Sequence, residues 1–275
     1  MKTVAIQGIA GAFHEEAALK YFGSGIKTSS SHSFSELLGK VSSAQSDFGI
    51  IAIENTVAGT IHQNLQLIRN HELHISGEIN LHIQQNLAAL PGTRIEDMKE
   101  VRSHYMAINQ SKQFLDQYPS IVRINDTDTA SSLKSVSTEQ LKNVGAIGSA
   151  HGANLYGLEI IAPSIETHKE NFTRFLVLER NPVESTSGNK ASWILKLRHE
   201  KGALAKLLTS LDEHNINLSK IESFPILGEP WNYEFFLDLE YIANELHLKA
   251  TQIIDEQSIS NRLLGRYDAF EPQVK

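Results

Sequence analysis

Short apolar segments alternate with helix-forming segments through the first two thirds of the sequence, and this alternation limits the possible folds more than any other feature. Residues 4–7 form an apolar strand that leads through a glycine-containing turn into helix-forming residues 13–22. Four more predicted strands lead into helices in the same way. Strand 48–53 leads into a helix near 61–69, and strand 101–103 into a helix near 105–118. Strand 121–124 leads into a helix that begins beyond 130, and strand 144–148 into a helix that ends at 155. This succession predicts an α/β sheet.

The last third of the sequence is organised differently. Residues 181–189 (NPVESTSGN) are rich in Pro, Ser, Gly and Asn, which is typical of a linker. After it the predicted order is strand, helix, strand, strand, helix, strand, at 191–198, 202–214, 216–225, 231–240, 244–256 and 263–270. This βαββαβ order is that of a ferredoxin-like module. We therefore predict two domains, 1–182 and 190–275.

The composition indicates a globular protein whose partners are small molecules. The chain has 275 residues, of which 41% are hydrophobic, enough for two cores. Its net charge of -7 is spread without a Lys/Arg block, which predicts contact with neither nucleic acid nor a membrane surface. The absence of cysteine excludes disulfides and a cysteine nucleophile, and the scattered histidines predict no metal site. With no signal-peptide core or membrane-length apolar run, the expected location is the cytoplasm.

Polar residues gather in the loops that follow the predicted strands, where open α/β sheets bind their ligands. Residues 8–11 (GIAG) lack the third glycine of a dinucleotide-binding loop, so a tight turn is the simpler interpretation. Residues 54–60 (ENTVAGT) bring a carboxylate, an amide and two hydroxyls to a strand end, although helix capping would explain them as well. His104, after another strand, is a candidate general acid or a helix cap.

A charged residue begins the last strand of the first region. In the segment NFTRFLVLER at 171–180, Arg174 cannot lose its charge, so it needs a carboxylate partner from the protein or a ligand. The triplet of Thr173, Arg174 and Phe175 resembles the TRF signature of prephenate dehydratases. Further motifs of that family follow in the matching order: GIAGAF (8–13), IENTVAG (53–59), SH (103–104) with Gln110, DTA (128–130) and LYGL (155–158). The resemblance covers nearly the whole chain.

This resemblance implies a two-lobed catalytic domain of the periplasmic-binding-protein type (type II). It implies the conversion of prephenate to phenylpyruvate on the way to phenylalanine, by loss of the ring hydroxyl together with the ring carboxylate. Such a carbon–oxygen lyase requires no cofactor and no metal. Thr173 is implied to act at the leaving hydroxyl, and Arg174 to meet a substrate carboxylate or to hold the site. The matching positions implied to bind substrate are Gly11, Asn55, Thr56, Gly59, Gln110, Thr129 and Phe175.

Strand geometry limits how the TRF triplet can act. In a regular strand over 172–178, Thr173 and Arg174 point to opposite faces. Both reach one substrate only if the strand begins after Arg174 or crosses the edge of a cleft. An unactivated threonine is a poor acid, so we expect Thr173 to work as an aligned hydrogen-bond donor that its neighbours polarise.

The last module carries segments similar to the phenylalanine-sensing ACT domain, at 202–204 (GAL) and 222–225 (ESFP). The resemblance implies that L-phenylalanine acts as an effector and that the chain assembles as a homodimer or homotetramer. The residues implied to bind the effector are Gly202, Ala203, Leu204, Glu222 and Ser223. The leucines at 204, 207, 208 and 211 have helical spacing and are expected to be core.

Several positions depart from the family motifs. Ile9 replaces a proline, Ala12 a threonine and His14 a serine, and Tyr105 and Met106 stand in place of Pro-Gln. Phe224 takes the place of the ESRP arginine, which removes a cation from near the implied effector site.

Three alternatives stay open at this point. Arogenate dehydratase differs only in the amino group of its substrate, and a single polar contact can decide that preference. A non-catalytic amino-acid sensor would keep the last module and lose activity in the first. A solute-binding protein of the periplasmic-receptor type would bind a ligand without turnover.

Overall fold

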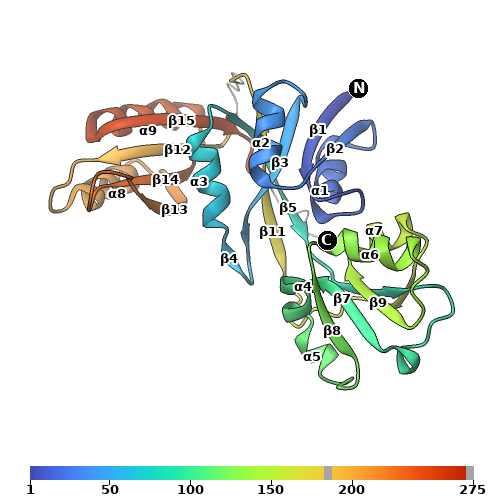
Figure 1. Cartoon of the computed structure of the whole chain (residues 1–275). Helices are drawn as coiled ribbons and strands as arrows, with labels where there is room; N and C mark the ends of the chain where they lie inside the picture. Colours follow the sequence, from blue (N-terminus) through green and yellow to red (C-terminus); the bar gives the residue numbers. More distant parts are fainter. Residues whose placement is uncertain (183–187, 271–275) are drawn as a thin grey trace. The chain divides into compact units, whose positions relative to one another are not determined.

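The chain folds into two compact units. The computed structural model describes residues 1–182 and 188–270. The first unit comprises Met1–Asn64 and Ile79–Phe175, and the second comprises Leu65–Glu78 and Leu176–Lys275. Figure 1 shows the chain coloured along its sequence, with the elements labelled. The short segment 65–78 therefore belongs with the last third of the chain, although it is distant from it in sequence.

The first sheet has the order β2-β1-β3-β11-β5, with β4 paired to β3. Its strands are β1 (Lys2–Gln7), β2 (Ile26–Ser31), β3 (Phe48–Asn55), β4 (Gly59–Thr60), β5 (His74–His82) and β11 (Phe172–Glu179). The associated helices are α1 (Phe13–Phe22), α2 (Phe34–Ser42) and α3 (His62–Asn70). The central strands β1, β3 and β11 each carry a run of at least three buried residues, as strands covered on both faces require.

The second sheet lies in the first unit and has the order β10-β6-β9-β7-β8. Its strands are β6 (Asn86–Ala89), β7 (Glu100–His104), β8 (Val122–Asp126), β9 (Val144–Gly148) and β10 (Glu159–Ala162). The helices are α4 (Tyr105–Gln110), α5 (Lys112–Leu115), α6 (Thr129–Thr138) and α7 (Ala150–Leu155), with a 3-10 turn η1 (Ile95–Asp97). The chain thus forms two α/β sheets before its last third, which confirms the predicted two-lobed α/β fold.

The third sheet lies in the second unit, with the antiparallel order β13-β14-β12-β15. Its elements are β12 (Lys190–Leu197), α8 (Ala203–Asp212), β13 (Asn217–Pro225), β14 (Tyr233–Glu240), α9 (Asn244–Gln257) and β15 (Ser258–Tyr267). Trp193 and Leu195 of β12 share a core with Leu207 of α8 and Ile253 of α9, so both helices cover the same face of the sheet. The predicted βαββαβ order is confirmed.

Some elements differ from the sequence predictions. Strands β2, β5, β6 and β10 and helix α2 were not predicted; β2 (IKTSSS) is polar because it lies at the sheet edge. The single helix predicted near 105–118 is wrong, because the buried Ser111 ends α4 at a φ of -97° and ψ of 13° before α5 begins. Strand β15 begins at Ser258, earlier than predicted, because α9 leads directly into it.

The predicted linker and domain ends are not tested by the structure. Residues 183–187 of the linker and 271–275 of the second domain lie outside the described residues. The boundaries 1–182 and 190–275 remain predictions. Among the helices within 1–182 and 188–270, none has the length and apolar content needed to span a membrane.

Candidate active site

A cavity of about 550 Å³ lies in the first unit, where loops from both of its sheets meet. Of the nine residues that the resemblance assigned to catalysis or substrate binding, six line it: Asn55, Gly59, Gln110, Thr129, Thr173 and Phe175. Gly11, Thr56 and Arg174 are not among the lining residues. The lining includes Asp128 and two histidines but no Lys or Arg among the described residues.

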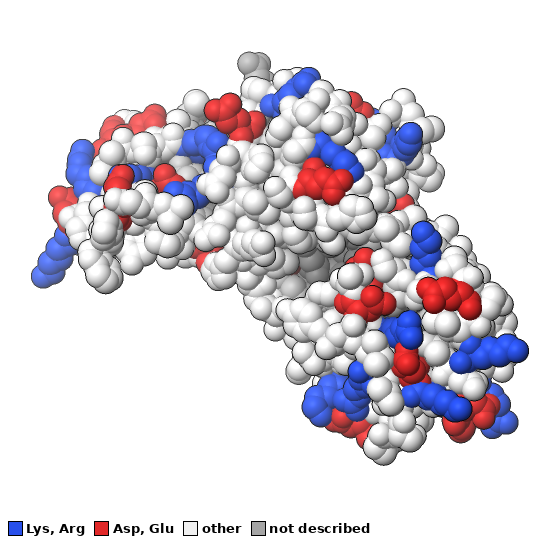
Figure 2. All heavy atoms as spheres, in the orientation of Figure 1, with Lys and Arg blue, Asp and Glu red and all other residues white. Residues whose placement is uncertain are grey.

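On the face shown in Figure 2, Lys and Arg are interspersed with Asp and Glu, with no continuous patch of one sign.

Thr173 is held in this cavity by the side chain of Asn55. Thr173 is 8% exposed, and its Oγ1 accepts a hydrogen bond of 3.0 Å from Asn55 Nδ2. The backbone N–H groups of Val57 and Ala58 donate to Asn55 Oδ1 at 3.0 and 2.8 Å, which fixes the orientation of the amide. An amide nitrogen only donates, so the hydroxyl hydrogen of Thr173 is not used on Asn55. No hydrogen bond among the described residues uses that hydrogen, which leaves it for a ligand.

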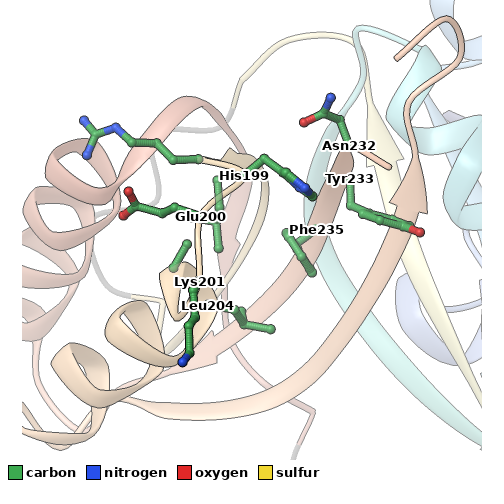
Figure 3. A pocket seen from close by; sticks show the side chains of 10 residues that line it. His199, Glu200, Lys201, Leu204, Asn232, Tyr233 and Phe235 are labelled. Carbon is green, nitrogen blue, oxygen red and sulfur yellow. The ribbon is translucent and has the colours of Figure 1, made fainter. Parts of the chain in front are cut away.

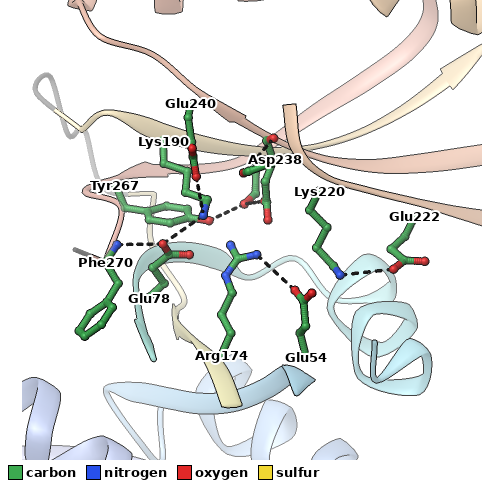
Figure 4. A network of polar contacts seen from close by, with 12 residues as sticks. Glu54, Glu78, Arg174, Lys190, Lys220, Glu222, Asp238, Glu240, Tyr267 and Phe270 are labelled. Atoms are coloured by element: carbon green, nitrogen blue, oxygen red, sulfur yellow. Dashed lines mark hydrogen bonds and ion pairs between the residues drawn. The ribbon is translucent and has the colours of Figure 1, made fainter. Parts of the chain in front are cut away.

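Arg174 lies on the other face of the strand from Thr173. Strand β11 begins at Phe172, before the triplet, so the regular alternation applies. Arg174 Nη1 lies 3.9 Å from Glu54 Oε2 at the end of β3, as Figure 4 shows. The arginine side chain is 11% exposed. The carboxylate partner that the sequence required is therefore provided by the protein.

His14 brings a titratable ring into the cavity wall. It lines the cavity from the first turn of α1, and its Nε2 is buried with no hydrogen-bond partner among the described residues. Burial lowers the pKa of His14 to about 4, because an apolar environment disfavours the imidazolium. His14 is therefore neutral at pH 7. From the sequence, this position was a departure from the family motif that introduces a titratable group.

His104 is the second histidine of the cavity and caps α4. Its Nδ1 accepts from Met106 N at 3.3 Å, so the ring proton of the neutral form is on Nε2. Burial lowers the pKa of His104, and the charge of Asp128 opposes this shift. Asp128 itself caps α6, since its Oδ1 accepts from Ser131 N at 2.7 Å. His104 therefore serves both as a cap and as a neutral hydrogen-bond donor.

The glycine loop after β1 has a structural role that the sequence did not reveal. Gly11 has a φ of 88°, and a Cβ there would lie 2.9 Å from Gly152 Cα at α7. Ser149 Oγ donates to Gly11 O at 3.0 Å, and Tyr156 OH donates to Ala10 O at 2.6 Å. Glycine is required at position 11 because the backbone of α7 approaches it closely. The loop joins elements that belong to the two sheets.

The side chain of Thr56 forms its hydrogen bonds with the protein backbone and does not line the cavity. Its Oγ1 donates to Glu170 O at 2.7 Å and accepts from Phe172 N at 2.9 Å. These bonds attach the loop after β3 to the start of β11. Among residues 1–182 and 188–270, no three His, Asp or Glu side chains converge as metal ligands.

Comparison with known families agrees with this arrangement of motifs. The family model for prephenate dehydratase matches residues 4–183. The chain belongs to the prephenate dehydratase family. The matched range includes the TRF triplet, the loop after β3 and the loop before α6, and residues of all three line one cavity.

Relatives and solved structures extend the similarity to most of the chain. A protein of Arabidopsis thaliana named arogenate dehydratase/prephenate dehydratase 1, chloroplastic, is 35% identical over 96% of this chain and 71% of its own length. The structure of prephenate dehydratase from Arthrobacter aurescens in complex with L-Phe is 27% identical, with a TM-score of 0.86 over 97% of this chain and 89% of that one. A structure described as GqqA, a novel type of quorum quenching acylases, is 25% identical with a TM-score of 0.86 over 98% of both chains.

The second unit has a cavity of its own, of about 390 Å³, at the start of α8. Figure 3 shows its lining, with Tyr233 and Phe235 from β14 and His199 and Lys201 from the loop after β12. Among the residues that the resemblance to prephenate dehydratases assigned to the effector, Ala203 and Leu204 line this cavity.

The remaining residues assigned to the effector do not line this cavity. Gly202 is the N-cap of α8, with a φ of 85°. Glu222 and Ser223 lie on β13, where Glu222 pairs with Lys220 at 3.3 Å. Phe224, which replaces the motif arginine, is 1% exposed and is not a lining residue.

Proposed function

We propose that this protein is a prephenate dehydratase, a hydro-lyase that converts prephenate to phenylpyruvate, carbon dioxide and water in phenylalanine biosynthesis. The observation that carries the proposal is the bond from Asn55 Nδ2 to Thr173 Oγ1, which leaves the threonine hydroxyl hydrogen available inside the family cavity. Membership of the family supports the reaction type.

The reaction needs a donor at the leaving hydroxyl. The bond between the ring carbon and the hydroxyl oxygen breaks, and the bond between the ring and its carboxylate breaks with it. The electron pair of the second bond completes the aromatic ring, and the departing oxygen takes a proton, ultimately supplied by solvent, to become water. Thr173 donates its hydrogen bond to that oxygen, and the bond that it accepts from Asn55 polarises the hydroxyl further.

The substrate carboxylates are bound by neutral donors. The described lining of the cavity contains no Lys or Arg, so we assign carboxylate binding to the amide of Gln110, the hydroxyl of Thr129 and the backbone at Gly59. Phe175, which is 1% exposed, supplies an apolar wall for the ring. Such a site keeps water from the reacting atoms and strengthens each hydrogen bond.

Arg174, Thr56 and Gly11 support the site and do not contact substrate in this proposal. The ion pair of Arg174 with Glu54 joins β11 to the end of β3. Thr56 attaches the adjoining loop to the start of β11, and Gly11 lets α7 approach the first loop. These residues position Thr173 and the walls of the cavity.

Turnover of the purified protein with prephenate tests the function directly, with phenylpyruvate followed by its absorbance. We expect turnover by the wild type, a loss of roughly a hundredfold or more in kcat for Thr173→Ala, and partial activity for Thr173→Ser, which keeps the hydroxyl. Arogenate in the same assay decides between the two dehydratases. Folded wild-type protein that turns over neither acid would overturn the proposal in favour of a sensor or solute-binding protein.

We further propose that residues 190–275 form an ACT domain that senses L-phenylalanine. The βαββαβ order, the cavity beside Ala203 and Leu204, and the similarity to a prephenate dehydratase in complex with L-Phe support this proposal. Titration calorimetry with L-phenylalanine tests it, and absence of heat would contradict it. The homodimer or homotetramer, the cytoplasmic location and the domain boundaries 1–182 and 190–275 belong to the same proposal.

A further inference from the structure

Asn171 occupies a buried position directly before the catalytic strand. It is 1% exposed and does not line the cavity. Its Oδ1 accepts a hydrogen bond of 2.7 Å from Asn55 Nδ2, and its Nδ2 donates to Gln110 Oε1 at 3.1 Å. Asn171 therefore joins the residue that holds Thr173 to the residue assigned to a substrate carboxylate.

Gln110 is held in place by a second amide. Gln85 Nε2 donates to the same Gln110 Oε1 at 3.2 Å, and Gln85 N donates to Glu166 Oε2 at 2.8 Å. Gln85 is 3% exposed and Glu166 is 2% exposed, so this support is inside the protein. Two donors thus meet the oxygen of Gln110. Its Nε2 takes part in no hydrogen bond among the described residues, and Gln110 lines the cavity.

The hydrogen bonds between these amides have one direction. The N–H groups of Val57 and Ala58 occupy Asn55 Oδ1, so Asn55 donates to Thr173 and to Asn171. The oxygen of Asn171 accepts the bond from Asn55, so its nitrogen is directed toward Gln110. Reversal of any one amide would place two donors or two acceptors against each other, which leaves buried polar groups unsatisfied and is therefore unfavourable.

We propose that Asn171 is a positioning residue that sets this direction, so that both Thr173 and Gln110 present donors to the substrate. This inference rests on the proposed function, because the donors matter only for a substrate whose leaving hydroxyl and carboxylates accept hydrogen bonds. The orientations of Thr173 and Gln110 are therefore coupled. Asn171 accepts a hydrogen bond from Asn55, which holds Thr173, and donates one to the side chain of Gln110.

The substitution Asn171→Asp keeps the shape of the side chain and changes only its donors. When the introduced carboxyl group is ionised, it accepts from Asn55 but cannot donate to Gln110 Oε1. The Gln110 amide then turns together with that of Gln85, whose Oε1 otherwise lacks a partner in the described part of the chain, and presents its oxygen to the cavity. When the same group is protonated, it has one O–H donor and one carbonyl acceptor, the same pair that asparagine provides. Burial favours the protonated form, so this form returns as the pH falls.

The neighbouring charged groups do not provide such a switch in the wild type. Glu166 pairs with Lys169 at 3.2 Å, and His82 Nε2 meets Lys169 O at 2.7 Å. In the described part of the chain, none of these three groups is hydrogen-bonded to the side chain of Asn171. These three groups are present in every variant, so their contribution cancels when variants are compared at each pH.

The experiment measures kcat and KM for prephenate between pH 5 and pH 8.5 in wild type, Asn171→Asp and Asn171→Ala. We expect Asn171→Asp to lose on the order of a hundredfold in kcat/KM at pH 8 and to recover at least about tenfold of this loss toward pH 5, relative to wild type. Asn171→Ala should be impaired at every pH without recovery, because alanine has no group to protonate.

A second variant keeps the inference testable if Asn171→Asp does not fold. Gln85→Glu places a carboxylate against Gln110 Oε1, and we expect the same recovery at low pH with a smaller loss, because Asn171 still donates to that oxygen. A profile of Asn171→Asp parallel to that of the wild type, or Asn171→Ala within threefold of wild type, overturns the inference. Absence of wild-type turnover overturns the proposed function itself, and the two failures are distinguished by that measurement.

Discussion

The rings of His14 and Phe175 meet edge to face, with their centroids 5.0 Å apart and their planes at 88°. Phe175 lies two residues beyond Thr173 on the same face of β11, so His14 packs beside the residue proposed to act on the leaving hydroxyl. Phe34 covers the imidazole further, with its centroid at 5.5 Å. The ring thus contributes an apolar surface as long as it stays neutral.

The buried His14 makes stability depend on pH. Its folded pKa, about 4, is lowered from 6.5 by burial, so below pH 6.5 the unfolded chain binds a proton that the folded chain does not. The stabilising effect of the neutral ring is complete above pH 6.5 and is lost as the pH falls toward 4. The whole shift corresponds to at most roughly 3 kcal/mol. Urea unfolding at pH 7.5 and pH 5 should show this loss in the wild type.

Replacement of the ring isolates this effect. His14→Phe should remove most of the difference in unfolding free energy between the two pH values, whereas His168→Phe, at an exposed position, should leave it unchanged. An undiminished pH difference in His14→Phe would show that His14 is not the group responsible.

Asn55 should be more sensitive to a change of charge than to a change of shape. Asn55→Asp can still accept from Val57 N and Ala58 N, so its loop should keep its conformation. The carboxylate cannot donate to Thr173; it accepts the threonine hydrogen and takes it away from the substrate. We expect kcat to fall on the order of a hundredfold, with a smaller change in KM. Steady-state kinetics with prephenate checks this.

The matched control is Asn125→Asp, the same substitution at an exposed position on β8. Its kcat should equal that of the wild type. An Asn55→Asp enzyme with wild-type kcat would contradict the role given to the bond between Asn55 and Thr173.

The sequence predicted the elements better than the contacts between them. Helix α1 and strand β9 have the predicted bounds, because an apolar run and a helix-forming run are local properties. Alternation along β11 also predicted that Thr173 and Arg174 face opposite ways. The partner of Arg174 could not be chosen among the chain's carboxylates, since Glu54 is brought near it only by the pairing of the first sheet.

The support of Thr173 was invisible in the sequence for the same reason. Asn55 and Asn171 are 116 residues apart, and no pattern relates them. No sequence feature indicated that Gln85 supports the site, because it lies outside the motifs that resemble the family. Segment 65–78 clusters by its contacts with the last third of the chain, and no local sequence feature indicates those contacts.

Gly202 should be required for the effector response. Its φ of 85° is in the region that residues with a Cβ disfavour, and a Cβ there would meet nothing within 4 Å. Gly202→Ala should therefore cost about 1 kcal/mol of stability by backbone strain alone. The strained turn should also weaken the binding of L-phenylalanine at least about tenfold, as measured by titration calorimetry, because α8 begins at the cavity.

Gly23→Ala separates strain from binding. Gly23, after α1, has equally open space around it, and its φ of 78° and ψ of 179° disfavour a Cβ more than the φ of 85° and ψ of 4° of Gly202 do, so the stability cost should be at least as large. Binding of L-phenylalanine should be unaffected in Gly23→Ala. Equal affinities of the Gly202→Ala and wild-type proteins would remove this loop from the effector site.

Lys190 and Glu78 form a buried ion pair in the second unit. The effects of replacing each of them on the free energy of unfolding should be strongly non-additive. Lys190 Nζ lies 3.1 Å from Glu78 Oε1 and 3.1 Å from Glu240 Oε1, as Figure 4 shows. The side chains of Lys190 and Glu78 are 7% and 3% exposed. Lys190→Met leaves the Glu78 carboxylate buried without this cation, which should cost about 3–5 kcal/mol of unfolding free energy.

Glu78 also accepts a hydrogen bond of 2.9 Å from Phe270 N, so the double variant Lys190→Met/Glu78→Gln keeps an acceptor there while removing the buried charge. We expect this double variant to recover at least about half of the lost stability in urea unfolding. The coupling free energy is the stability loss of the double variant minus the sum of the losses of Lys190→Met and Glu78→Gln. A coupling of zero would mean that the pair does not interact in the folded protein. Coupling of more than about 1 kcal/mol would show that segment 65–78 is held to the third sheet by charge as well as by apolar packing.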